Sequence, residues 1–154
     1  YSVAAHKVTM PRKDKFVPGA YYDTLMHEIG HSTGPALGRD LSGAFGSASY
    51  AFEELVAELT SVFMAAELGI PHDPATHENH AAYMKSWATA MKADKNMIFK
   101  AAAKAQQSTD YQNYVRNEHK LDLGLIKENT KTLAPLIAEK SKVLKKEKSL
   151  AMSM

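Results

Sequence analysis

The chain has 154 residues, of which 45% are hydrophobic and 23% are charged, and its formal net charge is +2. This composition predicts one soluble domain with one core, and so small a charge argues neither for nor against a nucleic-acid partner. Cysteine is absent, which excludes disulfides and cysteine-ligated zinc and leaves histidine and carboxylate side chains as metal ligands.

The N-terminal segment is predicted to contain a short β-strand. Residues 6–11, HKVTMP, alternate in polarity before a proline. A strand around Val8 to Met10 would offer an edge with which an extended peptide could pair. The segment lacks the apolar core of a secretory signal, and no apolar run in the chain is long enough to span a bilayer, so we expect no membrane partner. Because the chain starts at Tyr1 in strand-like sequence, we expect it to be a piece of a longer polypeptide.

The next predicted element is a helix that begins near residue 20 and ends around Thr33, where glycine and proline follow. It contains the HExxH motif, with His27 and His31 four residues apart and Glu28 between them. Residues at this spacing share one helix face, so both imidazoles can bind one metal ion. The alternative is that both histidines are ordinary surface or core residues. A catalytic zinc site also needs a third protein ligand from elsewhere in the chain.

A loop rich in glycine and serine, residues 34–49, carries Arg39 and leads to a second helix, YAFEELVAELTSVFMAAELGI. Glu54 and Glu58 are four residues apart on this helix and share a face. Glu54 can therefore bind the metal while Glu58 accepts a hydrogen bond from a ligand histidine. Glu53 is expected to point about a quarter turn away. The alternative is that these glutamates form a solvated stripe.

The rest of the chain is predicted to be helical. A histidine-rich turn precedes a third helix that starts near Thr76, and Trp87 on this helix is expected in the core. A fourth helix is predicted from about Asp94 through Tyr111, with Ile98 among its inward-facing residues. Histidines in a turn without helical spacing are more often solvated than bound to metal.

Beyond residue 114 the sequence becomes rich in lysine and shows no new catalytic pattern. We therefore predict two parts, a compact domain at residues 1–114 and a lysine-rich helical tail at residues 115–154. The acidic residues of the tail favour a solvated helix, and the alternative is a segment that contacts nucleic acid.

Four segments of the chain resemble one protein family. They are YYDTLMHEIGHSTG, FGSASYAFEELVAELTSVFMAAELGI, HAAYMKSWATAMKADKNMIF and KAAAKAQQSTDY. Over residues 6–111 they are similar to the metallopeptidase domain of ArdC-type antirestriction and polyvalent proteins. The resemblance implies a zincin-like metallopeptidase fold, mainly α with a small β element (α+β), that holds one divalent ion. It also implies a plasmid or phage protein in the bacterial cytoplasm, with a single-stranded-DNA-binding domain upstream.

The second helix also resembles the ligand helix of the ImmA/IrrE and CAAX prenyl protease groups. In those groups the first acid of the pattern binds zinc and the residue four positions later supports it, which implies Glu54 as the ligand and Glu58 as its support. The chain departs from the ArdC-type pattern at Ser32 and at residues 38–40, Gly-Arg-Asp. The resemblance therefore implies nothing about this loop in substrate binding.

Together these residues predict a zinc-dependent metalloendopeptidase that cleaves a protein or peptide. His27, His31 and Glu54 would bind Zn²⁺, with Mn²⁺ or Co²⁺ as alternatives, and Glu28 would act as general base and then general acid.

A further donor is expected to stabilise the oxyanion, and the candidates are Tyr50, Arg39 and His80. The alternative function is a non-proteolytic, metal-stabilised module that binds DNA or a host restriction factor. Glu28 favours the enzyme, because a structural zinc site closes its fourth position and has no use for a carboxylate beside an activated water.

Overall fold

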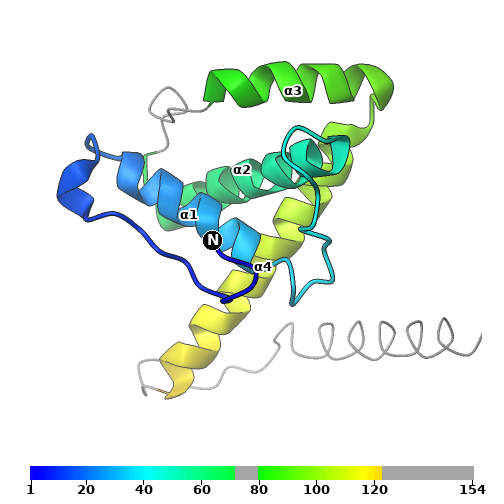
Figure 1. Cartoon of the computed structure of the whole chain (residues 1–154). Helices are drawn as coiled ribbons and strands as arrows, with labels where there is room; N and C mark the ends of the chain where they lie inside the picture. The colour runs from blue at the N-terminus through cyan, green and yellow to red at the C-terminus, as the bar shows by residue number, and fades with distance from the viewer. Residues whose placement is uncertain (72–79, 123–154) are drawn as a thin grey trace, which may run out of the picture. The chain divides into compact units, whose positions relative to one another are not determined.

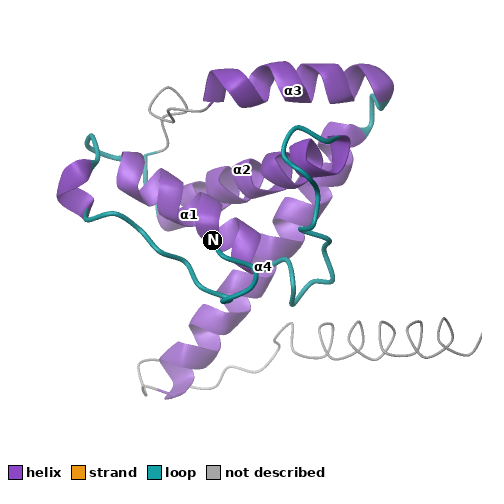
Figure 2. Ribbon diagram, viewed as in Figure 1, coloured by secondary structure: helices purple, strands orange, loops and turns teal. Residues whose placement is uncertain are grey.

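The computed structural model describes residues 1–71 and 80–122, and it describes side chains for residues 1–71 and 87–119. This part of the chain is helical (Figures 1 and 2), with the elements η1 (Lys13–Lys15), α1 (Ala20–Ser32), α2 (Ala48–Leu68), α3 (His80–Ala93) and α4 (Met97–Asp122). The contacts group the chain into two units, Tyr1–Thr109 and Asp110–Met154, and the first unit contains the hydrophobic core and the packing of α1 on α2. None of the described helices is long and apolar enough to cross a membrane.

The predicted β element is wrong. The described residues contain no strand, and Ser2 and Lys7 form only an isolated antiparallel bridge with N–H···O=C distances of 2.9 and 3.2 Å. Alternating polarity does not make a strand by itself, because the backbone N–H and C=O groups of a strand need a second strand beside them. The fold is therefore mainly α, and an edge around Val8 to Met10 has no sheet to extend.

The first two predicted helices are confirmed, with ends within two residues of those expected. α1 ends at Ser32, next to its predicted end. α2 begins after Ser47, whose side-chain oxygen accepts a hydrogen bond from the backbone N–H of Tyr50 at 3.1 Å. It ends at Gly69, whose φ of 64° is the left-handed conformation that favours glycine. Local signals, a cap at one end and a glycine at the other, thus fix the helix that carries the glutamates.

α4 differs from its prediction at both ends. It begins at Met97 rather than Asp94, because the Asp94 side chain accepts the backbone N–H of Asn96 at 3.0 Å and holds a turn before the helix. It also continues past its predicted end, so the boundary predicted between residues 114 and 115 falls within the helix and stays a prediction. Ile98, predicted to face inward, is 41% exposed. The start predicted for α3 lies outside the described residues.

A hydrophobic core joins α2 to α3 and to the beginning of α4. Its buried members are Ala51, Leu55, Val56, Trp87, Met97 and Ala101. The prediction that Trp87 lies in the core is confirmed, since it is 6% exposed and its indole N–H donates to the Ala51 carbonyl at 3.1 Å. α2 also packs against α1, so it is covered along most of its length. A helix covered in this way must provide a partner for every polar side chain that it buries.

α1 and α2 approach each other closely at Gly30. A Cβ atom added to Gly30 would lie 3.2 Å from the Ala57 Cα and 3.2 Å from the Thr60 Cβ, nearer than ordinary van der Waals contact. The Ser61 hydroxyl also donates to the Asp23 carbonyl at 3.1 Å across the same interface. Because the helices meet almost backbone to backbone, short side chains on either side of Gly30 can reach the other helix.

Substitution of Gly30 by valine should therefore separate the two helices. We expect Gly30→Val to lower the free energy of unfolding by about 1–3 kcal/mol, the usual cost of overpacking, as measured by chemical denaturation. The matched control is Tyr22→Val, which places the same side chain at an exposed position of α1 and should cost much less. Equal costs for the two variants would show that the close approach at Gly30 is not needed for stability.

Candidate metal centre

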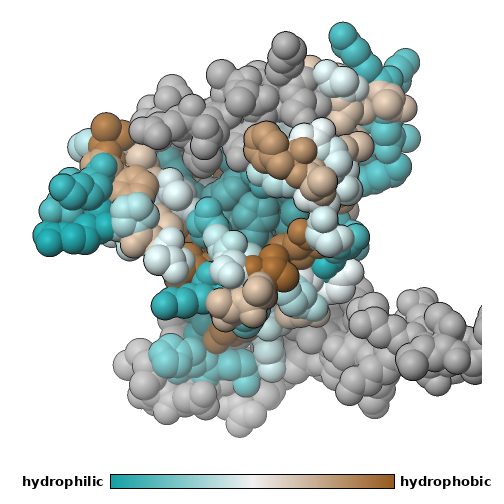
Figure 3. Space-filling view, in the orientation of Figure 1, coloured by the Kyte–Doolittle hydropathy of each residue, from teal (hydrophilic) through white to brown (hydrophobic). Residues whose placement is uncertain are grey.

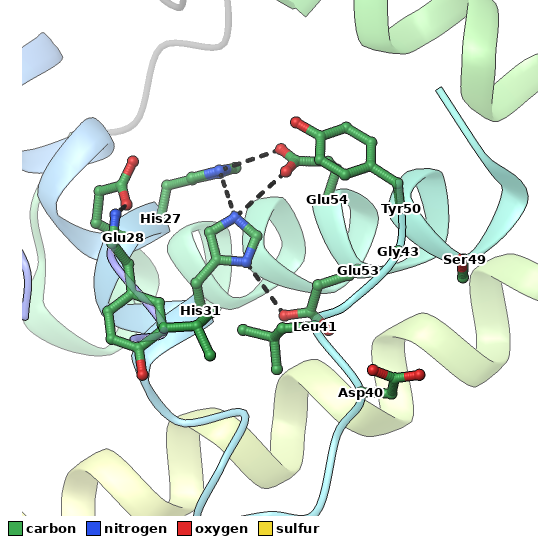
Figure 4. A pocket seen from close by; sticks show the side chains of 12 residues that line it. His27, Glu28, His31, Asp40, Leu41, Gly43, Ser49, Tyr50, Glu53 and Glu54 are labelled. Atoms are coloured by element: carbon green, nitrogen blue, oxygen red, sulfur yellow. Dashed lines mark hydrogen bonds and ion pairs between the residues drawn. The ribbon is translucent and has the colours of Figure 1, made fainter. Parts of the chain in front are cut away.

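Two histidines of α1 face one glutamate of α2 beside this close contact (Figure 4). His27 Nε2 lies 3.1 Å from His31 Nε2 and 3.4 Å from Glu54 Oε2. His31 Nε2 lies 3.5 Å from Glu54 Oε1. Within the described part of the chain, these three residues form a group whose donor atoms lie close enough together to hold one metal ion.

The spacing of these donor atoms fits a zinc ion. Ligand atoms about 2.0–2.1 Å from a tetrahedral ion are about 3.3 Å apart. This is close to the distance between the two Nε2 atoms and to the distance from each Nε2 to a Glu54 oxygen, and the two histidines contact different oxygens of this carboxylate. Two neutral imidazole nitrogens facing each other at 3.1 Å would also oppose their lone pairs unless a cation or a proton lay between them. Three protein ligands leave the fourth tetrahedral position to water or substrate, which is the pattern of catalytic zinc sites.

A further glutamate of α2 holds the second ring nitrogen of each histidine. His27 Nδ1 lies 3.2 Å from Glu58 Oε2, and His31 Nδ1 lies 3.1 Å from Glu53 Oε1. An ionised carboxylate only accepts hydrogen bonds, so each Nδ1 donates its proton, and the Nε2 of the neutral ring keeps its lone pair. Both rings are thus held in the tautomer that a metal ligand requires.

Glu53 is the site residue that the sequence pattern missed. It adjoins Glu54, so its helical position suggested that it points away, yet it is 7% exposed and contacts His31. His31 lies one turn beyond His27 on α1, and its ring therefore meets α2 at a different point. One signal could have found Glu53. If both histidines bind a metal through Nε2, each Nδ1 needs its own hydrogen-bond acceptor. Glu58 supplies the acceptor for one histidine only, so a second carboxylate should have been sought nearby.

Arg39, from the loop after α1, neutralises Glu53. Its Nε and Nη2 donate to the two carboxylate oxygens at 3.1 and 3.0 Å, and its side chain is 4% exposed. Nη2 also donates to the Gly30 carbonyl at 2.6 Å, while Nη1 donates to the Thr33 hydroxyl at 3.0 Å and to the Ser108 hydroxyl. All five N–H groups of the guanidinium are thus used within the protein. No N–H group of Arg39 is therefore left over to donate to a substrate oxyanion in this arrangement.

The same contacts set the charge of the centre. Burial lowers the pKa of His27, but its hydrogen bonds to Glu54 and Glu58 and the charges of both outweigh burial and raise the pKa to about 9. Burial raises the pKa of Glu54, but its hydrogen bond to His27, the charges of both histidines and a hydrogen bond from Tyr50 lower it below its usual value. At neutral pH without metal, both ring nitrogens of His27 are therefore protonated and the ring is positively charged, while Glu54 is ionised.

A cavity of about 300 Å³ opens beside the three donor residues. The space-filling view shows a hollow in this face with hydrophilic residues in it (Figure 3). Glu28 lines the cavity with a side chain that is 24% exposed. It lies next to His27 in Figure 4 but outside the group of three donors. Its carboxylate is thus beside the centre without being one of its ligands.

The three residues predicted as oxyanion donors have different positions. Tyr50 lines the cavity and makes its hydrogen bond to Glu54. Arg39 is bound to Glu53 and does not line the cavity. The side chain of His80 lies outside the described residues. The structure therefore places only Tyr50 of the described candidates at the cavity.

Comparison with known proteins shows one family and several relatives. The profile of the family described as "Zincin-like metallopeptidase" matches residues 1–104. Two proteins named DNA primase TraC from Escherichia coli are 44% identical over 114 residues and 45% identical over 115, in each case 72% of this chain but only 8% and 10% of their own length. A protein named "Uncharacterized protein y4eC" from Sinorhizobium fredii is 47% identical over 94 residues, 60% of this chain and 30% of its own length.

The chain thus spans less than a third of the length of these relatives. No solved structure matches it.

Metal binding at this centre should displace the proton from His27. Because the His27 pKa is about 9, we expect the apparent affinity for Zn²⁺ to rise roughly tenfold per pH unit between pH 6 and 8, with protons released on binding. Titration against a chelator of known affinity measures this slope. His119→Ala removes an exposed histidine and should leave the slope unchanged. A natural chain whose affinity is flat over this range would show that no proton competes with the ion.

Proposed function

The chain belongs to the zincin-like metallopeptidase family, and we propose that it is a zinc-dependent peptidase with ligands His27, His31 and Glu54 and general base Glu28. One observation carries the proposal. The ring nitrogens of His27 and His31 and the carboxylate of Glu54 lie close enough together to bind one ion, and a carboxylate that is not a ligand lines the cavity beside them. A purely structural zinc site would need a fourth protein ligand and would gain nothing from Glu28.

A bound Zn²⁺ supplies Lewis acidity, which makes water acidic enough to ionise near neutral pH and polarises a substrate carbonyl. The protein must then supply a base and keep its histidines in the right tautomer. Glu28 would accept the proton of the attacking water and return it to the leaving amine. Glu58 and Glu53 would hold the two imidazoles so that neither ring turns its proton-bearing nitrogen toward the ion.

Tyr50 is the donor that we propose for the developing oxyanion. It is on the cavity wall, one turn before Glu54 on α2, and its hydroxyl donates to Glu54 in the free chain. This O–H would turn from Glu54 to the oxyanion during the reaction.

The substrate that we propose is a protein or peptide, and the setting is a larger DNA-processing protein. The relatives named DNA primase are many times longer than the segment that they share with this chain. Such a protein would act in the bacterial cytoplasm, with other domains providing contact to DNA, and the resemblance to ArdC-type proteins makes an antirestriction role the one to test.

The decisive variant is Glu28→Gln, which keeps the size of the side chain and removes the base. We expect kcat/KM for an unstructured protein substrate such as casein to fall by about 10²–10⁴-fold, while the chain still binds one Zn²⁺. Removal of zinc by a chelator should abolish activity in the natural chain, and added zinc should restore it. The control is Glu67→Gln, which makes the same substitution at an exposed position of α2.

Two outcomes would contradict the proposal. A natural chain that holds one Zn²⁺ and cleaves nothing would favour a metal-stabilised binding module for DNA or a host factor. A Glu28→Gln variant as active as the natural chain would remove Glu28 from its proposed role.

A further inference from the structure

We infer that Glu53 and Arg39 are positioning residues of the metal centre, with Arg39 holding Glu53 and Glu53 holding His31. The inference rests on the proposed function only in taking His31 as a metal ligand. It deepens that proposal by assigning roles to a glutamate that the motif does not include and to an arginine from a loop without any helical pattern.

The first step is the contact between Glu53 and His31. Glu53 Oε1 lies 3.1 Å from His31 Nδ1, on the side of the ring away from Glu54, and both side chains are at least 87% buried. In this place the carboxylate fixes both the tautomer and the orientation of the ring. It also raises the electron density on Nε2, which strengthens binding of a cation there.

The second step is the pair between Arg39 and Glu53. A buried carboxylate is costly without a partner of opposite charge and hydrogen bonds to its oxygens. The forked contact from Arg39 supplies both, since one nitrogen meets each oxygen at 3.0 to 3.1 Å. The planar guanidinium fits the carboxylate in a way that the single ammonium of lysine does not.

This pair also decides which glutamate binds the ion. Glu53 and Glu54 are neighbours in sequence, and both line the cavity. The two oxygens of Glu53 are occupied by Arg39, and one of them also accepts from His31. Arg39 therefore withholds Glu53 from the metal and leaves Glu54 as the carboxylate ligand.

Arg39 is itself held by two other helices. Its contact with the Gly30 carbonyl caps the end of α1, where backbone carbonyls lack helical partners. Its contacts with Thr33 and Ser108 attach it to the end of α1 and to α4. The position of Glu53, and through it that of the His31 ring, is thus tied to α1, α2 and α4 together.

The test measures metal binding by the whole chain rather than hydrolysis. Zinc affinity is determined by competition with a chelator, and the visible spectrum of the Co²⁺-loaded chain reports coordination. We expect Glu53→Gln and Arg39→Met each to lower zinc affinity by about 10–100-fold. Arg39→Met should also change the Co²⁺ absorption, because a Glu53 without its arginine no longer holds the His31 ring in place. Arg39→Lys, which keeps the charge but not the fork, should recover only part of the affinity.

The matched control is Asp40→Asn. Asp40 also has a carboxylate on the cavity wall, but this carboxylate accepts the backbone N–H of Ser42 at 2.9 Å. Its loss should change zinc affinity less than about threefold if hydrogen bonding to the ligand, and not negative charge near the ion, is what matters. The inference is overturned if Glu53→Gln and Arg39→Met resemble Asp40→Asn in affinity and the natural chain in Co²⁺ spectrum.

If either buried variant fails to fold, nitrogen NMR of the zinc-loaded natural chain tests the same contact. His31 should carry its proton on Nδ1, and this proton should exchange slowly with solvent; a proton on Nε2 would overturn the inference.

The outcomes also separate the two proposals. A chain that binds zinc with the expected variant effects but cleaves no protein refutes the peptidase and keeps the positioning role, while a chain that binds no zinc refutes both.

Discussion

The close contact between α1 and α2 at Gly30 is the constraint on which the rest of the structure depends. Because no side chain separates the two backbones there, three glutamates of α2 are buried against the histidines of α1. Burying a carboxylate costs several kcal/mol unless it is paired and hydrogen-bonded. Hydrogen bonds offset this cost, since these carboxylates accept from both histidines, Arg39 and Tyr50. This cluster of charged side chains therefore lies beside a close contact between two helices.

A second consequence is that α2 contributes both to the apolar core and to the polar centre. Ala51, Leu55 and Val56 join Trp87 in the apolar core. The glutamates at positions 53, 54 and 58 of the same helix face α1 instead. Apolar burial does not depend on exact geometry, but a metal site does. The core contacts of α2 involve no metal, so its three buried glutamates would be presented to a metal ion from a helix that is already anchored.

The parts of this arrangement that could be predicted from the sequence are those set by local rules. The helix that carries HExxH and the end of α2 at Gly69 follow from spacing, capping and glycine. Glu53 could not be found in the same way, because its contact depends on how far along α1 the second histidine lies. Its partner Arg39 comes from a loop in which no periodicity indicates direction. The false strand has a related cause, since polarity in one segment does not reveal whether a second strand lies beside it.

The charges of the centre give an independent reason to expect a divalent ion. Among the residues of this centre, the three glutamates carry three negative charges when ionised, and Arg39 carries one positive charge. With both histidines neutral, two negative charges are left in a nearly dry interface, and these match one divalent cation. A proton on His27 balances only one of them, which explains why the pKa of that ring is raised to about 9 despite its burial. Metal binding and the stability of the α1–α2 interface should therefore be coupled, because the ion supplies the charge that the packing of these helices leaves unbalanced.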